Sequence, residues 1–199
     1  MKTKKELPNP KKISDLSIEE AISIRRTKRD FGKGLISIES LGQLLWAGQG
    51  ITDPGKTKRA APSAGAIYPF KIYLSVRNIK DLKEGIYKYL PQEHVLKLIN
   101  EKEAGDIKRA TFEQSFIEKA GVNLFLVADY EKITETYGSR GVRYVHIEAG
   151  HIAQNICLQA ESLSLNTVLV GSFDDEKMAN IFELEKEKLV YILSIGKSK

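Results

Sequence analysis

The sequence predicts a single domain of the α+β class. Strand-like and helix-like segments are not strictly interleaved along the chain, as a doubly wound α/β sheet would require. The 199 residues are enough for one domain with a substantial core. Hydrophobic residues make up 42% and charged residues 29%, which is typical of a globular protein and not of a disordered chain. We expect a basic, extended arm over residues 1–15 and one domain over residues 16–199.

The net charge of +5 arises mainly in the first twelve residues, where five lysines and one glutamate contribute +4. The rest of the chain is nearly neutral, which argues against a surface that follows a nucleic-acid backbone. No apolar run approaches 18 residues, and no apolar stretch follows the N-terminal charges. We therefore expect neither a membrane-spanning helix nor a secretory signal, and we expect the protein in the cytoplasm.

Two helices are expected in the first fifty residues. Ser17 and Glu20 form a capping box, which predicts a helix from about Ile18 to Arg26. A second helix is expected after the potential N-cap Ser37, because apolar residues then recur on one face. This pattern stops near Gly50, which favours the end of the helix there.

The middle of the chain predicts strands. Residues 52–69 have no clear periodicity, and a loop of this length inside a small domain is often functional. Apolar and polar residues alternate over 70–76, which indicates a strand, and residues 86–90 and 95–99 are expected to pair as a hairpin. A helix is expected near Glu103 to Glu118.

The C-terminal part predicts the longest helix of the chain. Residues 122–128 are nearly all apolar and indicate a buried strand. Apolar residues then recur at spacings of three and four over 145–163, which predicts a helix with a wide apolar stripe. Strands are expected over 167–170 and 189–195, with a short helix capped by Asp174 or Asp175 between them.

A cluster of basic residues forms the first candidate site. Arg25, Arg26, Thr27, Lys28 and Arg29 follow one another at the end of the first predicted helix. Guanidinium groups match the geometry of phosphate, and a following loop can turn several of them toward one anion. The alternative is a solvated basic turn that is favoured by the helix dipole.

Two further segments are candidates for ligand contacts. Residues 61–69 are rich in small residues, which let a planar ligand approach the backbone, although the segment can also be a simple connector. It lacks the signatures of a P-loop and of a hydrolase nucleophile elbow. Residues 170–174 lie at a strand-to-helix junction, where backbone groups often face ligands, although a plain capped turn is the alternative.

The cysteine and the histidines do not suggest a metal site. Cys157 is the single cysteine, which excludes an internal disulfide and any metal site with several cysteines. We expect it to be a small core residue. His146 and His151 are five residues apart in the longest predicted helix and so do not share a face. The sequence therefore predicts no metal ligands.

Six segments together carry a resemblance that covers residues 16–197. They are R-R-T-K-R-D-F at 25–31, L-L-W-A-G-Q-G-I-T at 44–52, A-P-S-A-G-A-I-Y-P at 61–69, Y-G-S-R-G-V-R-Y at 137–144, E-A-G-H-I-A-Q-N at 148–155 and V-G-S-F-D-D at 170–175. In this order and spacing they resemble the nitroreductase-like flavoprotein family. They are similar in particular to its SagB-type, or thiazole/oxazole oxidase-like, branch.

The resemblance implies a fold, a cofactor and a set of site residues. The expected fold has three layers, with a mainly antiparallel central sheet flanked by helices, and dimerises through a long central helix. The expected cofactor is FMN, bound at the interface of a homodimer. The resemblance assigns Arg25, Arg26, Thr27 and Arg29 with Lys197 to the phosphate end, Val170, Gly171 and Ser172 to the ring, and Pro62, Ser63, Ala64, Gly65 and Ala66 to contacts from the neighbouring subunit.

The resemblance also implies an FMN-dependent oxidoreductase. The flavin accepts hydride at N5 and passes electrons on, so donor and acceptor bind in turn by a ping-pong mechanism. NAD(P)H-linked reduction of nitro compounds or quinones is the expected reaction, and Tyr137 is the candidate catalytic residue. Azoline-oxidising members carry a Lys-Tyr pair where this chain has Thr136-Tyr137. Thiazoline or oxazoline dehydrogenation, flavin binding without turnover, and nucleic-acid binding are the alternatives.

Overall fold

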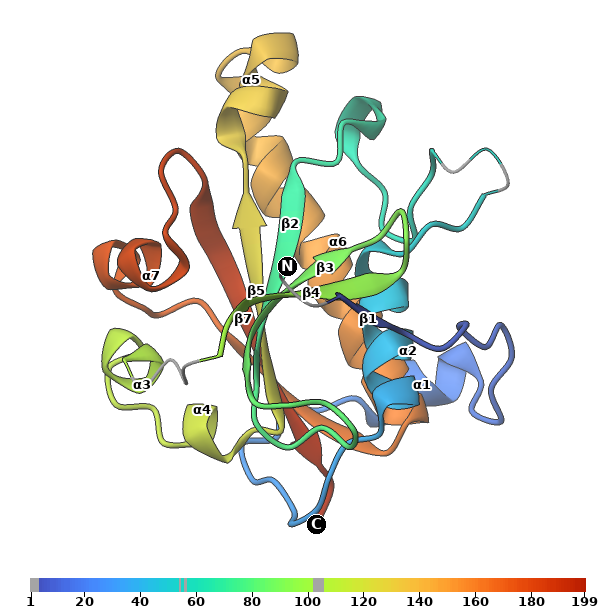
Figure 1. The fold of residues 1–199 in the computed structure, drawn as a ribbon. Helices are drawn as coiled ribbons and strands as arrows, with labels where there is room; N and C mark the ends of the chain where they lie inside the picture. Colours follow the sequence, from blue (N-terminus) through green and yellow to red (C-terminus); the bar gives the residue numbers. More distant parts are fainter. Residues whose placement is uncertain (1–3, 54, 56, 102–105) are drawn as a thin grey trace.

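A seven-stranded antiparallel sheet forms the centre of the molecule (Figure 1). The computed structural model describes residues 4–53, 55, 57–101 and 106–199. Within these ranges the strand order is β1-β4-β3-β2-β5-β7-β6, and every neighbouring pair is antiparallel. The strands are β1 (Lys4–Glu6), β2 (Phe70–Val76), β3 (Gly85–Leu90), β4 (Val95–Asn100), β5 (Val122–Ala128), β6 (Leu165–Val170) and β7 (Lys188–Lys197).

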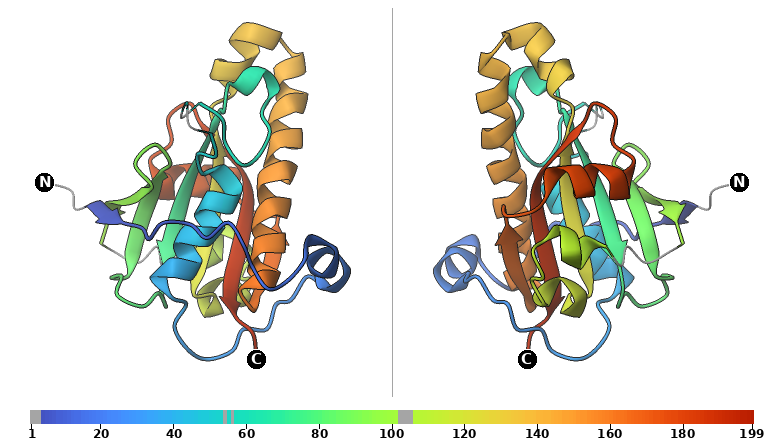
Figure 2. Two further views of the ribbon diagram at one scale, coloured as in Figure 1. Left: turned by 90° about the vertical axis from the view of Figure 1, so that its right-hand side faces the viewer. Right: turned by 90° about the vertical axis from the view of Figure 1, so that its left-hand side faces the viewer.

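Helices cover both faces of this sheet. They are α1 (Ile18–Ile24), α2 (Ile38–Gln49), α3 (Ile107–Ala110), α4 (Phe116–Lys119), α5 (Tyr130–Tyr137), α6 (Arg140–Ser162) and α7 (Asp175–Phe182). Figure 2 shows α2 and α6 on one face and α3, α4 and α7 on the other, while α5 extends beyond the end of β5. This arrangement confirms the expected α+β class and the three-layer architecture with an antiparallel sheet.

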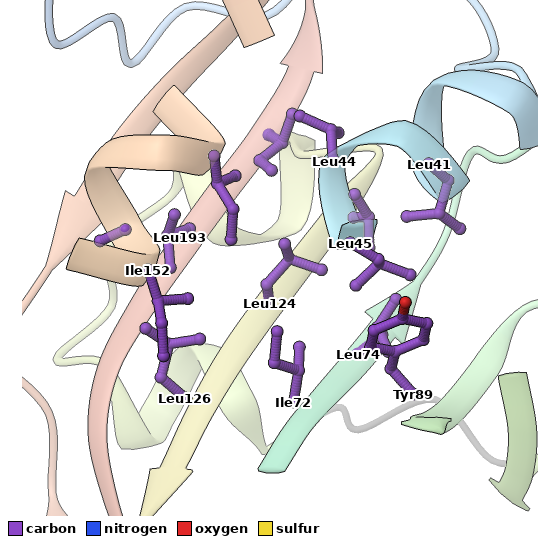
Figure 3. Packing of buried hydrophobic residues seen from close by; sticks show 14 of the residues in the cluster. Leu41, Leu44, Leu45, Ile72, Leu74, Tyr89, Leu124, Leu126, Ile152 and Leu193 are labelled. Atoms are coloured by element: carbon purple, nitrogen blue, oxygen red, sulfur yellow. The ribbon is translucent and has the colours of Figure 1, made fainter. Parts of the chain in front are cut away.

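The alternation of side chains along the strands produces two cores. Ile72 and Leu74 of β2 point toward α2 and α6, where they pack in one cluster with Leu45 and Ile152 (Figure 3). Tyr73 lies between them in sequence and points to the other face, where its ring lies 5.7 Å from that of Phe182. Because successive strand residues point to opposite faces, a sheet covered on both sides must be apolar at nearly every position.

Three predicted helix starts, those after Ser17, Ser37 and Asp174, are confirmed. The Ser17 hydroxyl accepts from the Glu20 N–H and the Glu20 carboxylate accepts from the Ser17 N–H. Ser37 caps α2 in the same way, and of the two candidates for α7 it is Asp174 that acts as the cap. The first helix ends at Ile24, because the backbone of Arg25 is already extended.

One helix prediction was wrong, and one helix was not predicted. The expected helix near residues 103–118 is replaced by the short helices α3 and α4, and residues 103–105 lie outside the described ranges. Phe112 and Glu113 have positive φ angles of 52° and 60°, which interrupt the helical backbone between α3 and α4. The sequence reasoning missed α5, whose N-cap Asp129 accepts from the Lys132 N–H.

The segment expected as a basic arm contributes to the sheet. β1 pairs with β4, and Leu7 is buried in the core on the α2 side. His94 fixes the chain just beyond, because its Nε2–H donates to the Pro8 carbonyl while Nδ1 accepts from the Tyr89 hydroxyl. No helix in the described ranges is both long and apolar enough to cross a lipid bilayer.

Candidate functional site

The basic segment lies along the outer edge of β6. Thr27 and Thr167 form a parallel β-bridge, and the Lys28 N–H donates to the Thr167 carbonyl at 2.9 Å. These backbone contacts hold residues 25–29 in an extended path directly after α1. The edge of β6 therefore fixes the place of the cations that the sequence predicts for anion binding.

Three of these residues keep their polar groups available. The guanidinium of Arg26 turns back to the Ser23 and Arg25 carbonyls, and Lys28 pairs with Glu161 at 3.5 Å. Within the part of the chain that the structure describes, no hydrogen bond or ion pair engages the side chains of Arg25, Thr27 or Arg29. Two guanidinium groups and one hydroxyl thus remain for a ligand.

Lys197 lies at the same end of β6. It is the last residue of β7, where it pairs with Leu165, and its carbonyl accepts from the Gly32 N–H at 2.8 Å. Lys197 and Thr27 therefore flank the first half of β6 from its two sides. The structure brings Lys197 near the basic segment although about 170 residues separate them in sequence.

Gly171 lies just beyond the opposite end of β6. It is four residues past Thr167, which is about 13 Å along an extended strand. A Cβ at this position would meet only Tyr191 at 3.9 Å, so the space beside Gly171 is open. Its neighbours differ, because Val170 is buried in the core and Ser172 is exposed with its carbonyl accepting from Gln114.

The small-residue loop lies at the N-terminal half of α6. Ala64–Ala66 form a single 3-10 turn, and Pro62, Gly65 and Ala66 are exposed. Gly65 has a φ of 59°, and a Cβ there would come within 2.6 Å of the Tyr137 hydroxyl. The glycine thus permits both the backbone conformation and the close approach of Tyr137. The structure places the expected catalytic tyrosine against this loop, with its ring edge-on to Tyr144.

The buried carboxylate of Glu148 on α6 binds the small-residue loop through Ser63. Ser63 Oγ donates to Glu148 Oε2 at 2.6 Å, and Gln49 Nε2 donates to Glu148 Oε1 at 3.5 Å. Glu148 is 1% exposed. This burial raises the pKa of the Glu148 carboxyl from the ordinary 4.5 to about 6, against the lowering effect of its two hydrogen bonds.

Arg59 and Tyr68 complete a closed ring of hydrogen bonds with Ser63, Glu148 and Gln49. The Arg59 guanidinium donates to Gln49 Oε1 at 2.6 Å and lies 4.8 Å above the Tyr68 ring. The Arg59 N–H donates to the Tyr68 hydroxyl, and the Tyr68 N–H donates to Ser63 Oγ at 2.9 Å. Sequence reasoning missed this ring, although a glutamate within the apolar stripe of the 145–163 helix is an unusual feature that marks Glu148.

Glu148 should give the protein a specific pH dependence of stability. A folded pKa above the unfolded value means that this group stabilises the fold fully below pH 4.5, and that the stabilisation is lost as the pH rises through about 6. The shift corresponds to about 2 kcal/mol. In Glu148→Gln we expect the difference in unfolding free energy between pH 4.5 and pH 8 to change by about that amount, as measured by urea titration. An unchanged difference would contradict the burial of an ionisable carboxyl here.

The two groups of predicted site residues lie apart within one protomer. Glu161 contacts the basic segment and Glu148 contacts the small-residue loop. These glutamates are thirteen residues apart on α6, which is about 20 Å along the helix axis. The phosphate-end candidates and the loop therefore occupy different ends of the same helix.

The comparisons with known proteins agree with this architecture. Residues 22–197 match the model of the Nitroreductase family. The chain belongs to the nitroreductase family. A relative from Methanocaldococcus jannaschii that is named as a nitroreductase is 38% identical over 186 residues, which are 93% of each chain. The microcin B17-processing protein McbC of Escherichia coli is 25% identical over 167 residues, which are 81% of this chain and 61% of McbC.

Solved structures of nitroreductase relatives share the fold. A protein from Ralstonia eutropha that is described as a nitroreductase superposes with a TM-score of 0.85 at 26% identity, over 98% of this chain and 90% of that one. A chain of the E. coli microcin synthetase complex McbBCD superposes with a TM-score of 0.75 at 23% identity, over 98% of this chain and 79% of that one. The similarity to McbC agrees with the resemblance to the SagB-type branch.

Proposed function

We propose that this nitroreductase-family oxidoreductase uses FMN. The observation that carries the proposal is the arrangement along β6. The free guanidinium groups of Arg25 and Arg29 lie at one end with Lys197, and open space lies beside Gly171 at the other. FMN is itself elongated, with a phosphate at one end of its ribityl chain and an uncharged ring at the other. Arginine forks suit the phosphate, and a glycine at a strand end suits a planar ring.

The proposed assembly is a homodimer in which each flavin is held by both copies. Within one protomer the loop at Ser63 and the basic segment are separated by about 20 Å along α6. In the proposed dimer the loop that meets each flavin ring comes from the second copy. Val142 and Ile147 on α6 are 41% and 47% exposed, and the isoleucines of α1 beside α6 are exposed as well. A second copy packed on this face would bury these side chains.

The protein's own part in the chemistry is binding, orientation and access. FMN, when bound, supplies hydride and electron transfer through its atom N5. Arg25, Thr27, Arg29 and Lys197 would hold its phosphate end by charge-assisted hydrogen bonds. The exposed backbone of the small-residue loop would lie along the ring, and Tyr137 beside it would donate or accept a proton. One open ring face would serve donor and acceptor in turn, which is the basis of the expected ping-pong kinetics.

The proposed reaction is NAD(P)H-linked reduction of nitro compounds or quinones. The similarity to McbC favours a second candidate, thiazoline or oxazoline dehydrogenation during peptide modification. The presence of Thr136 where azoline-oxidising relatives carry lysine argues against it. A flavin-binding dimer without turnover is the third candidate.

Spectroscopy of the purified protein separates these candidates. We expect a yellow protein that releases FMN on denaturation, is bleached by NADH or NADPH without oxygen, and regains its colour with a nitro compound or quinone. Bleaching only by an azoline-containing peptide would select the second candidate, and a yellow protein that no donor reduces would select the third. A colourless protein that binds no added FMN would contradict the cofactor proposal.

Gly171→Leu tests the placement of the ring. A Cβ here makes an ordinary contact with Tyr191 at 3.9 Å, and Gly171 is exposed, so we expect the variant to fold, which its Tm checks. The larger side chain would occupy the space proposed for the ring, and we expect FMN affinity to fall about 10- to 100-fold, as overpacking of a filled site does. Gly171→Ala is the control and should have a smaller effect. Normal affinity and turnover in Gly171→Leu would rule out this placement.

A further inference from the structure

The loop from Ser63 to Tyr68 is held in an unusual conformation. Gly65, Ala66 and Tyr68 have φ angles of 59°, 54° and 51°, which is the left-handed region. Non-glycine residues adopt this region only where the surrounding structure determines it. A specific set of contacts must therefore keep Ala66 and Tyr68 in place.

The contacts that determine the loop converge on Ser63. Its Oγ accepts from the Tyr68 N–H at 2.9 Å, which ties the end of the loop to its beginning. The same Oγ donates to Glu148 Oε2 at 2.6 Å, which ties the loop to α6. The direction of this second bond requires an acceptor at Glu148, and an ionised carboxylate is an acceptor at both oxygens.

A glutamate at position 148 is less favourable for folding than an apolar residue would be. Val145, Ala149 and Ile152 occupy the same stripe of α6 and are buried in the core. A buried carboxylate is unfavourable unless it is hydrogen-bonded. Gln49 and Ser63 donate hydrogen bonds to Glu148. The positive charges of Arg59, which precedes the 63–68 loop, and of Lys132 on α5 also favour its ionised form. A group whose ionised form disfavours folding and which nevertheless has hydrogen-bond partners at both oxygens is characteristic of functional sites.

The geometry points to Glu148 as a positioning residue, which acts through Ser63 to fix the 63–68 loop for contact with the flavin of the partner copy. This inference rests on the proposed function. The loop presents Gly65 and Ala66 outward while Ser63 faces inward, so Glu148 itself would touch no cofactor. Protonation of Glu148 converts one of its two acceptor oxygens into a donor and removes the charge, which weakens the bond that Glu148 accepts from the Ser63 hydroxyl.

A double-mutant cycle in FMN affinity tests whether Glu148 acts through Ser63. Glu148→Gln removes the charge and leaves one acceptor oxygen where Ser63 and Gln49 now use two. At pH 7.5 we expect it to weaken binding of FMN to the full-length apoprotein about tenfold, because hydrogen bonds to charged groups are the stronger ones. In the Ser63→Ala background the same change should have less than about a threefold effect, because the connection is already absent. An equal effect in both backgrounds, or none in either, would overturn the inference.

A matched control separates positioning from general destabilisation. Ser194 Oγ donates to Asn123 Oδ1 at 2.6 Å in a buried site between β7 and β5, at the end of β5 away from the loop. Ser194→Ala should therefore lose stability much as Ser63→Ala does but keep its FMN affinity. A comparable loss of FMN affinity in Ser194→Ala would show that stability alone explains the effect, and would overturn the inference.

Two readouts keep this inference distinct from the proposed function. In flavin-free protein, hydrogen exchange at the Tyr68 amide should be about tenfold faster in Glu148→Gln, and unchanged exchange would overturn the inference without reference to flavin.

FMN affinity of the wild type should fall between pH 8 and pH 5.5, and this fall should be smaller in Glu148→Gln. All other ionisable groups are common to the two proteins, so the difference isolates Glu148. Wild-type protein that binds no FMN would overturn the proposed function and this inference together.

Discussion

Simultaneous replacement of Arg25 and Arg29 by alanine should strip the protein of FMN while leaving it folded. Neither guanidinium has a hydrogen-bond or ion-pair partner among the described residues, so the fold loses no visible contact. A hydrogen bond to a charged group contributes about 1.5–3 kcal/mol. Removal of two should weaken FMN binding about 10²- to 10⁴-fold, as measured by fluorescence titration of the apoprotein.

The control removes the same charge from the opposite face of the sheet. Arg109 and Lys177 are exposed on α3 and α7, and among the described residues they pair with Asp106 and Asp174. Their joint replacement by alanine should leave FMN affinity within about twofold, because exposed ion pairs contribute little. If the Arg25 and Arg29 double variant kept stoichiometric FMN, the phosphate end would have to lie elsewhere.

Gly150→Trp should produce a monomer that holds no flavin. Gly150 lies in the middle of the exposed face of α6, and a Cβ there meets no atom within 4 Å. The indole can therefore project into solvent in the protomer, and replacement of a helical glycine by tryptophan favours the helix by about 0.5 kcal/mol. In the proposed dimer the indole would stand where the second copy packs. Sedimentation velocity should show the monomer mass, with an unchanged far-UV circular dichroism spectrum.

A surface tryptophan on the other side of the sheet is the control. Asn180 is exposed on α7, so Asn180→Trp should remain a dimer with bound FMN. A dimeric, yellow Gly150→Trp protein would show that α6 does not form the interface. A monomeric Gly150→Trp protein with full FMN would instead show that one protomer is sufficient for the cofactor.

Local signals predicted much of the fold. Ser17, Ser37 and Asp174 act as caps because capping depends on residues only three positions away. The alternation of apolar and polar residues, together with the short apolar runs, predicted the positions of strands β2 to β7. The helix expected near 103–118 failed because Phe112 and Glu113 adopt positive φ angles, which periodicity does not reveal.

The site was predictable only in pieces. The basic segment, the small-residue loop and the Gly171 junction are visible as motifs, but their mutual placement depends on strand register and on α6. The ring around Glu148 joins residues 85 and 99 positions apart in sequence, so no local pattern contains it. A buried polar side chain in an apolar stripe marks such a residue without identifying its partners.

The path of residues 27–32 has a consequence for the behaviour of the protein in a crowded solution. An uncovered outer strand is a template for pairing with other chains and so promotes aggregation. Here Thr27 shields the outer side of β6, and the other outer strand, β1, carries Lys4 and Lys5 within its described residues Lys4–Glu6. The segment proposed to bind the cofactor therefore also covers an outer edge of the sheet that could otherwise pair with other chains. Solubility and flavin binding thus depend on the same short stretch of chain.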